Sequence, residues 1–139
     1  MSRLRMFVSL SRADRAVVVD AFLLAIPVEL GLRCIGFARL VKLIDKTCES
    51  RRPRHSLVDV ERAAGLVERV SRFYPFEATC LRKSLVLWWL LKRRGVPARL
   101  RLGVRTLDGF EAHAWVECDG RPVFDGDLAH RFAPLPLEL

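Results

Sequence analysis

Three residues in the second half of the 139-residue chain could together catalyse acyl transfer: Cys80, His113 and Asp125. A cysteine thiolate is a nucleophile, a histidine can take up and return a proton near neutral pH, and a carboxylate can fix the tautomer of that histidine. Taken singly, each has an ordinary structural explanation, as a small core residue, a histidine hydrogen-bonded within a sheet, and a turn residue before glycine. Taken together, they predict a catalytic triad if the fold brings them side by side.

Cys80 lies at the start of a predicted helix over residues 80–94. Thr79 is the expected N-cap residue, because its hydroxyl can accept from the free N–H groups of the first turn. These N–H groups and the helix dipole favour a thiolate, and the cations of Arg82 and Lys83 are expected to add to this effect. The middle of the helix is apolar on all sides, which is typical of a buried helix.

Three strands are predicted after this helix, over residues 98–105, 111–117 and 121–125. The first alternates strictly between apolar and polar residues, as a half-buried strand does. Turn signals at Asp108-Gly109 and Asp119-Gly120 separate the strands. Such short connections predict an antiparallel meander.

The loop between the last two strands decides whether Asp125 can reach His113. A three-residue loop over 118–120, with its glycine in the left-handed conformation, places Asp125 directly opposite His113 on the same face of the sheet. A two-residue loop shifts the register by one and moves Asp125 to the other face. We therefore predict the three-residue loop, in which Cys118 is a surface thiol, and keep Asp127 as the alternative carboxylate.

The first half of the chain is predicted to be helical. Ser11 begins a helix that Pro27 is expected to kink or end, because proline lacks an N–H group and clashes with the preceding turn. The helical pattern resumes over residues 28–46, and another helix runs to about Arg72. The apolar face of the resumed helix is expected to consist of Leu32, Ile35, Leu40, Leu43 and Ile44.

Helices followed by a buried helix and an antiparallel meander predict an α+β fold. We expect residues 1–73 to form a helical N-terminal region that docks a partner and residues 74–139 to form the catalytic core, within one compact unit. At 51% apolar residues and a formal charge of +8, the chain is globular and basic. Four cysteines without metal-ligand spacing, no signal sequence and no transmembrane span favour the cytoplasm.

Five segments around the candidate triad closely resemble the cysteine peptidases of lasso-peptide biosynthesis, which belong to the transglutaminase-like, papain-related superfamily. The similarity is carried by residues 80–85, 91–98, 101–104, 112–117 and 120–123. Before residue 74, the similarity is limited to length and helical character.

The resemblance implies that Cys80 is the nucleophile, His113 the general base and acid, and Asp125 the orienting carboxylate. It implies hydrolysis of the bond that joins leader to core in a ribosomal precursor peptide, without metal or cofactor. Papain-like enzymes place a glutamine before the cysteine as an oxyanion donor. No glutamine precedes Cys80, so Tyr74 is considered for that role. Trp115, predicted on the same face as His113, is expected to line the substrate site.

The resemblance also implies several partners. The precursor peptide is one, a separate leader-recognition protein is another, and the macrolactam-forming cyclase is a third. The exposed apolar parts of the first helices, together with Arg33, Arg39, Lys42 and the basic linker at 51–54, are expected either to dock the recognition protein or the leader, or to be an ordinary core with a solvated basic face. No nucleic-acid partner is expected.

Two other functions stay open at this level. A transglutaminase-like acyl or amide transferase would use the same triad, because hydrolysis and aminolysis share an acyl-enzyme. A basic module that binds nucleic acid or an anionic membrane surface would show salt-dependent binding indifferent to Cys80.

Overall fold

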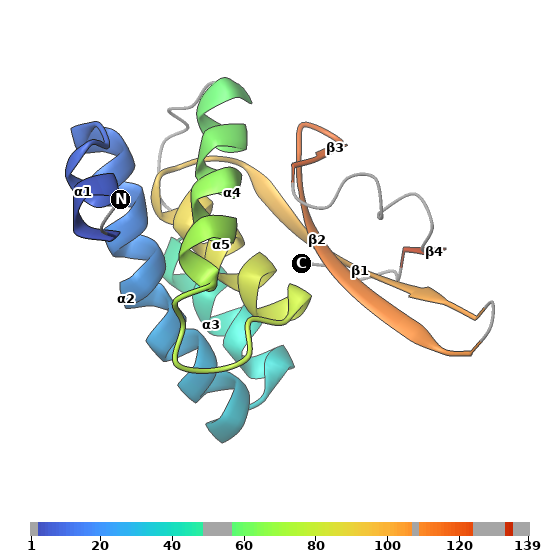
Figure 1. The fold of residues 1–139 in the computed structure, drawn as a ribbon. Coiled ribbons are helices and arrows are strands. Elements are labelled where there is room, and N and C mark those ends of the chain that lie inside the picture. The colour runs from blue at the N-terminus through green and yellow to red at the C-terminus, as the bar shows by residue number, and fades with distance from the viewer. Residues whose placement is uncertain (1–2, 49–56, 107–108, 124–132, 135–139) are drawn as a thin grey trace.

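The computed structural model describes residues 3–48, 57–106, 109–123 and 133–134. Within these ranges, helices lie on one side of the molecule and a twisted antiparallel sheet on the other (Figure 1). The helices are α1 (Arg3–Val8), α2 (Arg12–Cys34), α3 (Phe37–Cys48), α4 (Leu57–Ser71) and α5 (Cys80–Arg93), and the strands are β1 (Ala98–Arg105), β2 (Glu111–Cys118), β3 (Arg121–Pro122) and β4 (Ala133–Pro134). This arrangement confirms the α+β prediction.

Helix α5 is the centre of the core, as its apolar sequence predicts. It packs against α2, α4 and the strands β1 and β2. Trp88 is almost fully buried, and its indole N–H donates to the carbonyl of Ala98. The predicted buried helix is therefore confirmed, and Thr79 caps its start as expected.

Helix α2 continues through Pro27, so the prediction that this residue ends the helix is wrong. The proline removes one N–H from the helix ladder, which by itself disfavours a helix interior. The neighbouring residues Ala25 and Val28 are buried against the core on both sides of the proline. We infer that this packing outweighs the local preference. No helix in the described part of the chain is long and apolar enough to cross a membrane.

The break between α2 and α3 occurs at Gly36 instead. Gly36 has a φ of +84°, a left-handed conformation that ends many helices, and its N–H donates to the carbonyl of Gly31. The new helix α3 turns Leu40 and Ile44 into the core. Ile35 and Leu43, predicted on the same apolar face, are exposed. Gly36 separates Ile35 from α3, whereas Leu43 lies on α3 itself.

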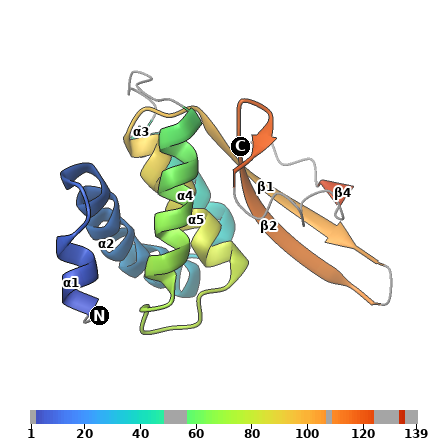
Figure 2. The same cartoon turned by 45° about the horizontal axis from the view of Figure 1, so that its top comes forward.

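The sheet has the strand order β3-β2-β1-β4, and the hairpin of β1 and β2 extends beyond the helices (Figure 2). Leu100 pairs with Val116, and both belong to the core shared with the helices. Directly paired residues project to one face and alternate residues to the other. The opposite face therefore carries the pairs Gly103–His113, Arg101–Trp115 and Arg99–Glu117.

The loop between β2 and β3 has two residues, so the predicted three-residue loop is wrong. Cys118 pairs with Arg121, which leaves only Asp119 and Gly120 in the turn. Both have positive φ values, +53° and +76°, the combination of a type I′ turn. Cys118 consequently belongs to the strand and faces the core, where it is 1% exposed. It is not the surface thiol that the sequence suggested.

Candidate active site

Cys80 is the first residue of α5 and is partly exposed. Thr79 before it has extended backbone angles, and its hydroxyl accepts from the N–H of Arg82 at 3.3 Å. The N–H groups of Cys80 and Leu81 come earlier in the first turn and have no acceptor within the helix. They are therefore suited to hold an oxyanion next to the thiol.

Three consecutive side chains fix this end of α5 to three different elements. Arg82 binds Glu29 of α2 through two of its nitrogens, and Lys83 binds Glu68 of α4 at 3.1 Å. Ser84 donates to the backbone carbonyl of Ala114 in β2, also at 3.1 Å. The position of Cys80 is thus set by α2, α4 and the sheet together.

The cations of Arg82 and Lys83 do not act as free positive charges beside Cys80, as the sequence had suggested. Each is paired with a carboxylate. Glu29 is 7% exposed and also accepts from Arg33 at 2.6 Å. Hydrogen bonds from Arg82 hold the pKa of Glu29 below its ordinary value despite burial, so its carboxylate stays ionised. We therefore assign Arg82 a positioning role rather than an electrostatic one.

His113 lies in the middle of β2 and is 8% exposed. Its ring stacks against Trp115, with centroids 6.1 Å apart and planes inclined by 20°. The two residues share the sheet face opposite the helical core, which confirms that Trp115 lies on the same face as His113. Cys80 can consequently meet His113 only around an edge of β2.

The bond between Ser84 and Ala114 lies at such an edge. The N–H of Val123 donates to the carbonyl of Val116, so that carbonyl points toward β3. Carbonyls two residues apart point to the same side of a strand, so the Ala114 carbonyl points that way too. Ser84 follows Cys80 by one helical turn on the same face of α5, and Ala114 follows His113 directly. The structure therefore brings the turn that carries Cys80 beside the part of β2 that carries His113.

The third predicted catalytic residue, Asp125, lies outside the described residues, as does the alternative Asp127. Asp125 lies opposite His113 only if the loop between β2 and β3 has three residues. In the observed register Glu117 lies opposite Pro122, which corresponds to a two-residue loop. This register does not support a position of Asp125 opposite His113. Asp125 is retained on the resemblance alone.

The family model of the transglutaminase-like superfamily matches residues 22–136. The chain belongs to the transglutaminase-like superfamily. Comparison with curated proteins and with solved structures finds no significant match. Members of this superfamily commonly have peptidase or transferase activity that depends on a Cys-His-Asp triad. The match begins at residue 22, so it covers the second half of α2 together with α5 and the strands of the sheet.

Tyr74 has a structural position in this transglutaminase-like core. Its hydroxyl donates to the carbonyl of Ala21 at 3.1 Å, and its ring packs between Phe22 and Phe76. Burial raises its pKa, so the proton of the hydroxyl stays in place. Because that proton is already donated to α2, the structure does not support Tyr74 as the second oxyanion donor.

Trp115 is buried more deeply than is expected of a side chain that lines an open substrate site. It is 2% exposed, and its indole N–H donates to Glu117 at 3.1 Å. It supports one side of the His113 ring, which makes it a positioning residue.

Sequence reasoning missed Ser84 and Glu29, since a serine or glutamate within a helix gives no signal of its distant partner.

Proposed function

We propose that the chain is a cysteine peptidase that removes the leader from a ribosomally made lasso precursor peptide. In this proposal Cys80 is the nucleophile, His113 the general base and acid, and Asp125 the carboxylate that orients His113. One observation carries it: Cys80 begins a helix that Ser84 ties to Ala114, next to His113, in a chain of the transglutaminase-like superfamily. The resemblance of the segments around these residues supports the finer assignment.

The first step forms an acyl-enzyme. The Cys80 thiolate attacks the carbonyl carbon of the bond between leader and core, and the N–H groups at the start of α5 stabilise the oxyanion. Protonated His113 gives its proton to the nitrogen of the core, and the C–N bond breaks. The core leaves with a free amine, and the leader stays on Cys80 as a thioester.

The second step releases the leader. His113, now neutral, takes a proton from water, and the resulting hydroxide attacks the thioester carbonyl. The C–S bond breaks, which leaves the leader with a terminal carboxylate and restores the Cys80 thiolate beside protonated His113. We propose that a separate recognition protein holds the leader during both steps and that a cyclase then closes the macrolactam of the core.

The test is cleavage of a precursor peptide in the presence of its recognition protein, followed by mass spectrometry. We expect the chain to release leader and core, and Cys80→Ala and His113→Ala to abolish release while binding of the recognition protein persists. Asp125→Ala is expected to slow the reaction less severely. Cys34→Ala is the matched control, because Cys34 is an exposed cysteine at the end of α2. Cleavage by Cys80→Ala would contradict the proposal.

The same assay separates hydrolysis from amide transfer. With an added primary amine, a peptidase still yields a leader that ends in a carboxylate. A transferase yields the corresponding leader amide, because the amine then takes the place of water at the thioester. Accumulation of the amide as the main product would replace the peptidase assignment with the transferase.

A further inference from the structure

The outward face of α2 is apolar along most of its length. The exposed positions between Ala13 and Leu30 carry no charged residue. Five of its large side chains are between 39% and 59% exposed and are spaced so that they follow one side of the helix: Val19, Phe22, Leu23, Ile26 and Leu30. We call these five residues the α2 strip. A helix that is apolar outside as well as inside is typical of one that another surface covers.

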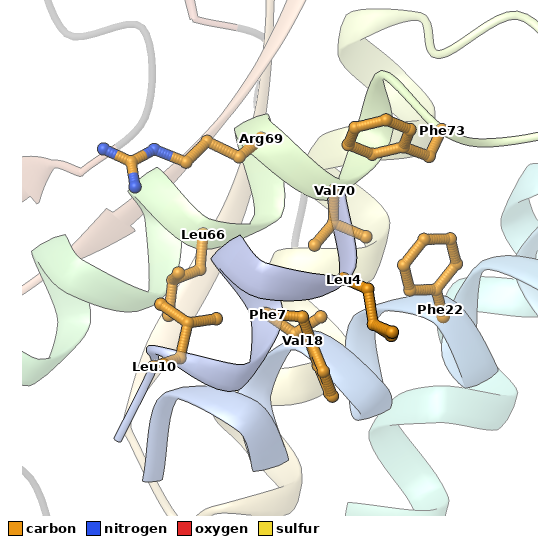
Figure 3. A pocket seen from close by; sticks show the side chains of 9 residues that line it. All are labelled: Leu4, Phe7, Leu10, Val18, Phe22, Leu66, Arg69, Val70 and Phe73. Carbon is orange, nitrogen blue, oxygen red and sulfur yellow. The ribbon is translucent and has the colours of Figure 1, made fainter. Parts of the chain in front are cut away.

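A cavity of about 330 Å³ adjoins the α2 strip at Phe22 and lies between α1, α2 and α4. Figure 3 shows Leu4, Phe22 and Phe73 gathered at one side of it, while the guanidinium of Arg69 extends away from the apolar side chains. All other lining residues are apolar. A convex strip beside a hollow suits a protein surface with a protruding side chain, because a bilayer surface offers no such side chain.

The charges around these two features are basic. All three carboxylates of α2 are already occupied by arginines: Asp14 by Arg62, Asp20 by Arg94, and Glu29 by Arg82 and Arg33. Arg12, Arg69 and Arg72 are exposed, and none of them forms an ion pair with another described residue. Arg69 lines the cavity, Arg72 precedes Phe73 at its mouth, and Arg12 begins α2. A partner that covers the α2 strip would therefore bind most tightly if it carried carboxylates that pair with these arginines.

We propose that the α2 strip and the adjoining cavity bind a helical segment of a partner protein, apolar on one face and with Asp or Glu beside that face. A large apolar side chain of the segment fills the cavity, and its carboxylates pair with Arg12, Arg69 and Arg72. A second copy of this chain fits less well, because a two-fold axis at this surface would bring the same arginines together.

This surface contains neither of the candidate catalytic residues Cys80 and His113, although Leu30 at its far end follows Glu29, which binds Arg82 of α5. Figures 1 and 2 place α1 and the first half of α2 on the side of the helices away from the β1–β2 hairpin. The proposal uses neither Cys80 nor His113 and does not rest on the proposed peptidase activity. Binding at this surface is therefore expected to be unchanged in the Cys80→Ala variant.

The probe is a fluorescein-labelled synthetic helical peptide with leucine on one face and glutamate on the other, and binding is measured by anisotropy. A matched peptide has lysine in place of glutamate. We expect the glutamate peptide to bind and the lysine peptide not to bind. Ile26→Gln and Arg69→Glu should each weaken binding roughly tenfold or more, as loss of a contact at the centre of an interface does. Leu43→Gln is the control, because Leu43 on α3 is 53% exposed, close to the 56% of Ile26.

Four outcomes would overturn the proposal. If neither peptide binds, or if both bind equally, the surface does not select an acidic partner. Binding to vesicles of phosphatidylcholine and phosphatidylserine that Ile26→Gln abolishes would assign the surface to a membrane. Dimerisation in sedimentation that Ile26→Gln abolishes would assign it to a second copy. Both substituted side chains are exposed, so thermal unfolding should confirm that the variants fold as the parent does.

Discussion

The hydroxyl of Ser84 donates a hydrogen bond to the backbone carbonyl of Ala114, and both groups are buried. This bond joins the helix that Cys80 begins to the strand that carries His113. A buried hydroxyl and a carbonyl that points off the edge of a strand each need a partner, and here each supplies the other. Ser84 thereby fixes how the first turn of α5 meets β2, while Arg82 and Lys83 fix the same turn against α2 and α4.

Replacement of Ser84 by alanine should cost activity beyond its cost in stability. Loss of the bond should lower the free energy of unfolding by about 1 kcal/mol, the usual net contribution of one hydrogen bond. Because the turn that carries Cys80 is then free to shift against His113, kcat should fall and the pH profile of kcat/KM should move.

Thr47→Ala is the matched control for Ser84→Ala. The hydroxyl of Thr47 donates to the carbonyl of Ile44 at 2.9 Å and lies 3.8 Å from the sulfur of Cys48, both within α3. It should cause a comparable or smaller loss of stability without any change in the pH profile. If Ser84→Ala alters only the unfolding temperature, Ser84 is a core residue and not a positioning residue for the site.

Replacement of Glu29 by glutamine should destabilise the fold in a pH-dependent way. The arginine hydrogen bonds lower the pKa of Glu29 from its ordinary value of 4.5. A carboxyl with a lowered pKa in the folded state contributes its full stability above its unfolded pKa and loses it as the pH falls through the folded value. Thermal unfolding should therefore show the largest difference between the parent and Glu29→Gln near neutral pH.

That difference should shrink as the pH falls below about 4.5, the pKa of an ordinary glutamate. Glu61→Gln provides the control, because Glu61 is exposed on α4 and forms no ion pair with another described residue. A difference that is independent of pH would mean that Glu29 acts through packing and not through its charge.

The parts of the fold that were predictable are those that depend on neighbouring residues. The hydroxyls of Ser11 and Thr79 accept from the N–H groups three residues later, as their places before helical segments predict. The prediction that the helix ends at Pro27 was wrong because tertiary packing of α2 outweighs the preference of one residue. The loop at 119–120 was wrong because Asp119 adopts a positive φ, and a type I′ turn then needs only two residues.

The helix start at Cys80 and the strand around His113 were predictable, but the contacts that hold these two candidate residues in place were not. Cys80 is recognisable from its place after an N-cap, and His113 from its place between two alanines in a strand. Glu29 and Arg82 are separated by 53 residues, and Ser84 and Ala114 by 30, so no local pattern links them. Contacts of this length are set by how the helices pack on the sheet, which the sequence pattern alone does not specify.

Tyr74→Phe should separate a structural role from a catalytic one. Without its hydroxyl, the residue loses the bond to Ala21, and the free energy of unfolding should fall by about 1 kcal/mol. Activity should not change, since the hydroxyl already donates within the core. A fall in kcat on the order of 100-fold or more, as follows the loss of an oxyanion donor, would instead restore Tyr74 to the catalytic site.

Alkylation of the native protein should divide its four cysteines into two pairs. Cys34 is exposed and Cys80 partly exposed, whereas Cys48 and Cys118 are buried. Burial raises the pKa of the Cys118 thiol, which also donates to the carbonyl of Pro97 at 3.6 Å, so its reactive thiolate is scarce. Iodoacetamide followed by peptide mass mapping should therefore label Cys34 and Cys80 in the folded state and all four after denaturation. The loss of activity should follow the extent of labelling at Cys80. Molecules in which only Cys34 is labelled should remain active. Labelling of Cys118 as fast as Cys34 would place this residue in an exposed loop, which would contradict the two-residue turn and return the β2–β3 register to the one that sets Asp125 opposite His113.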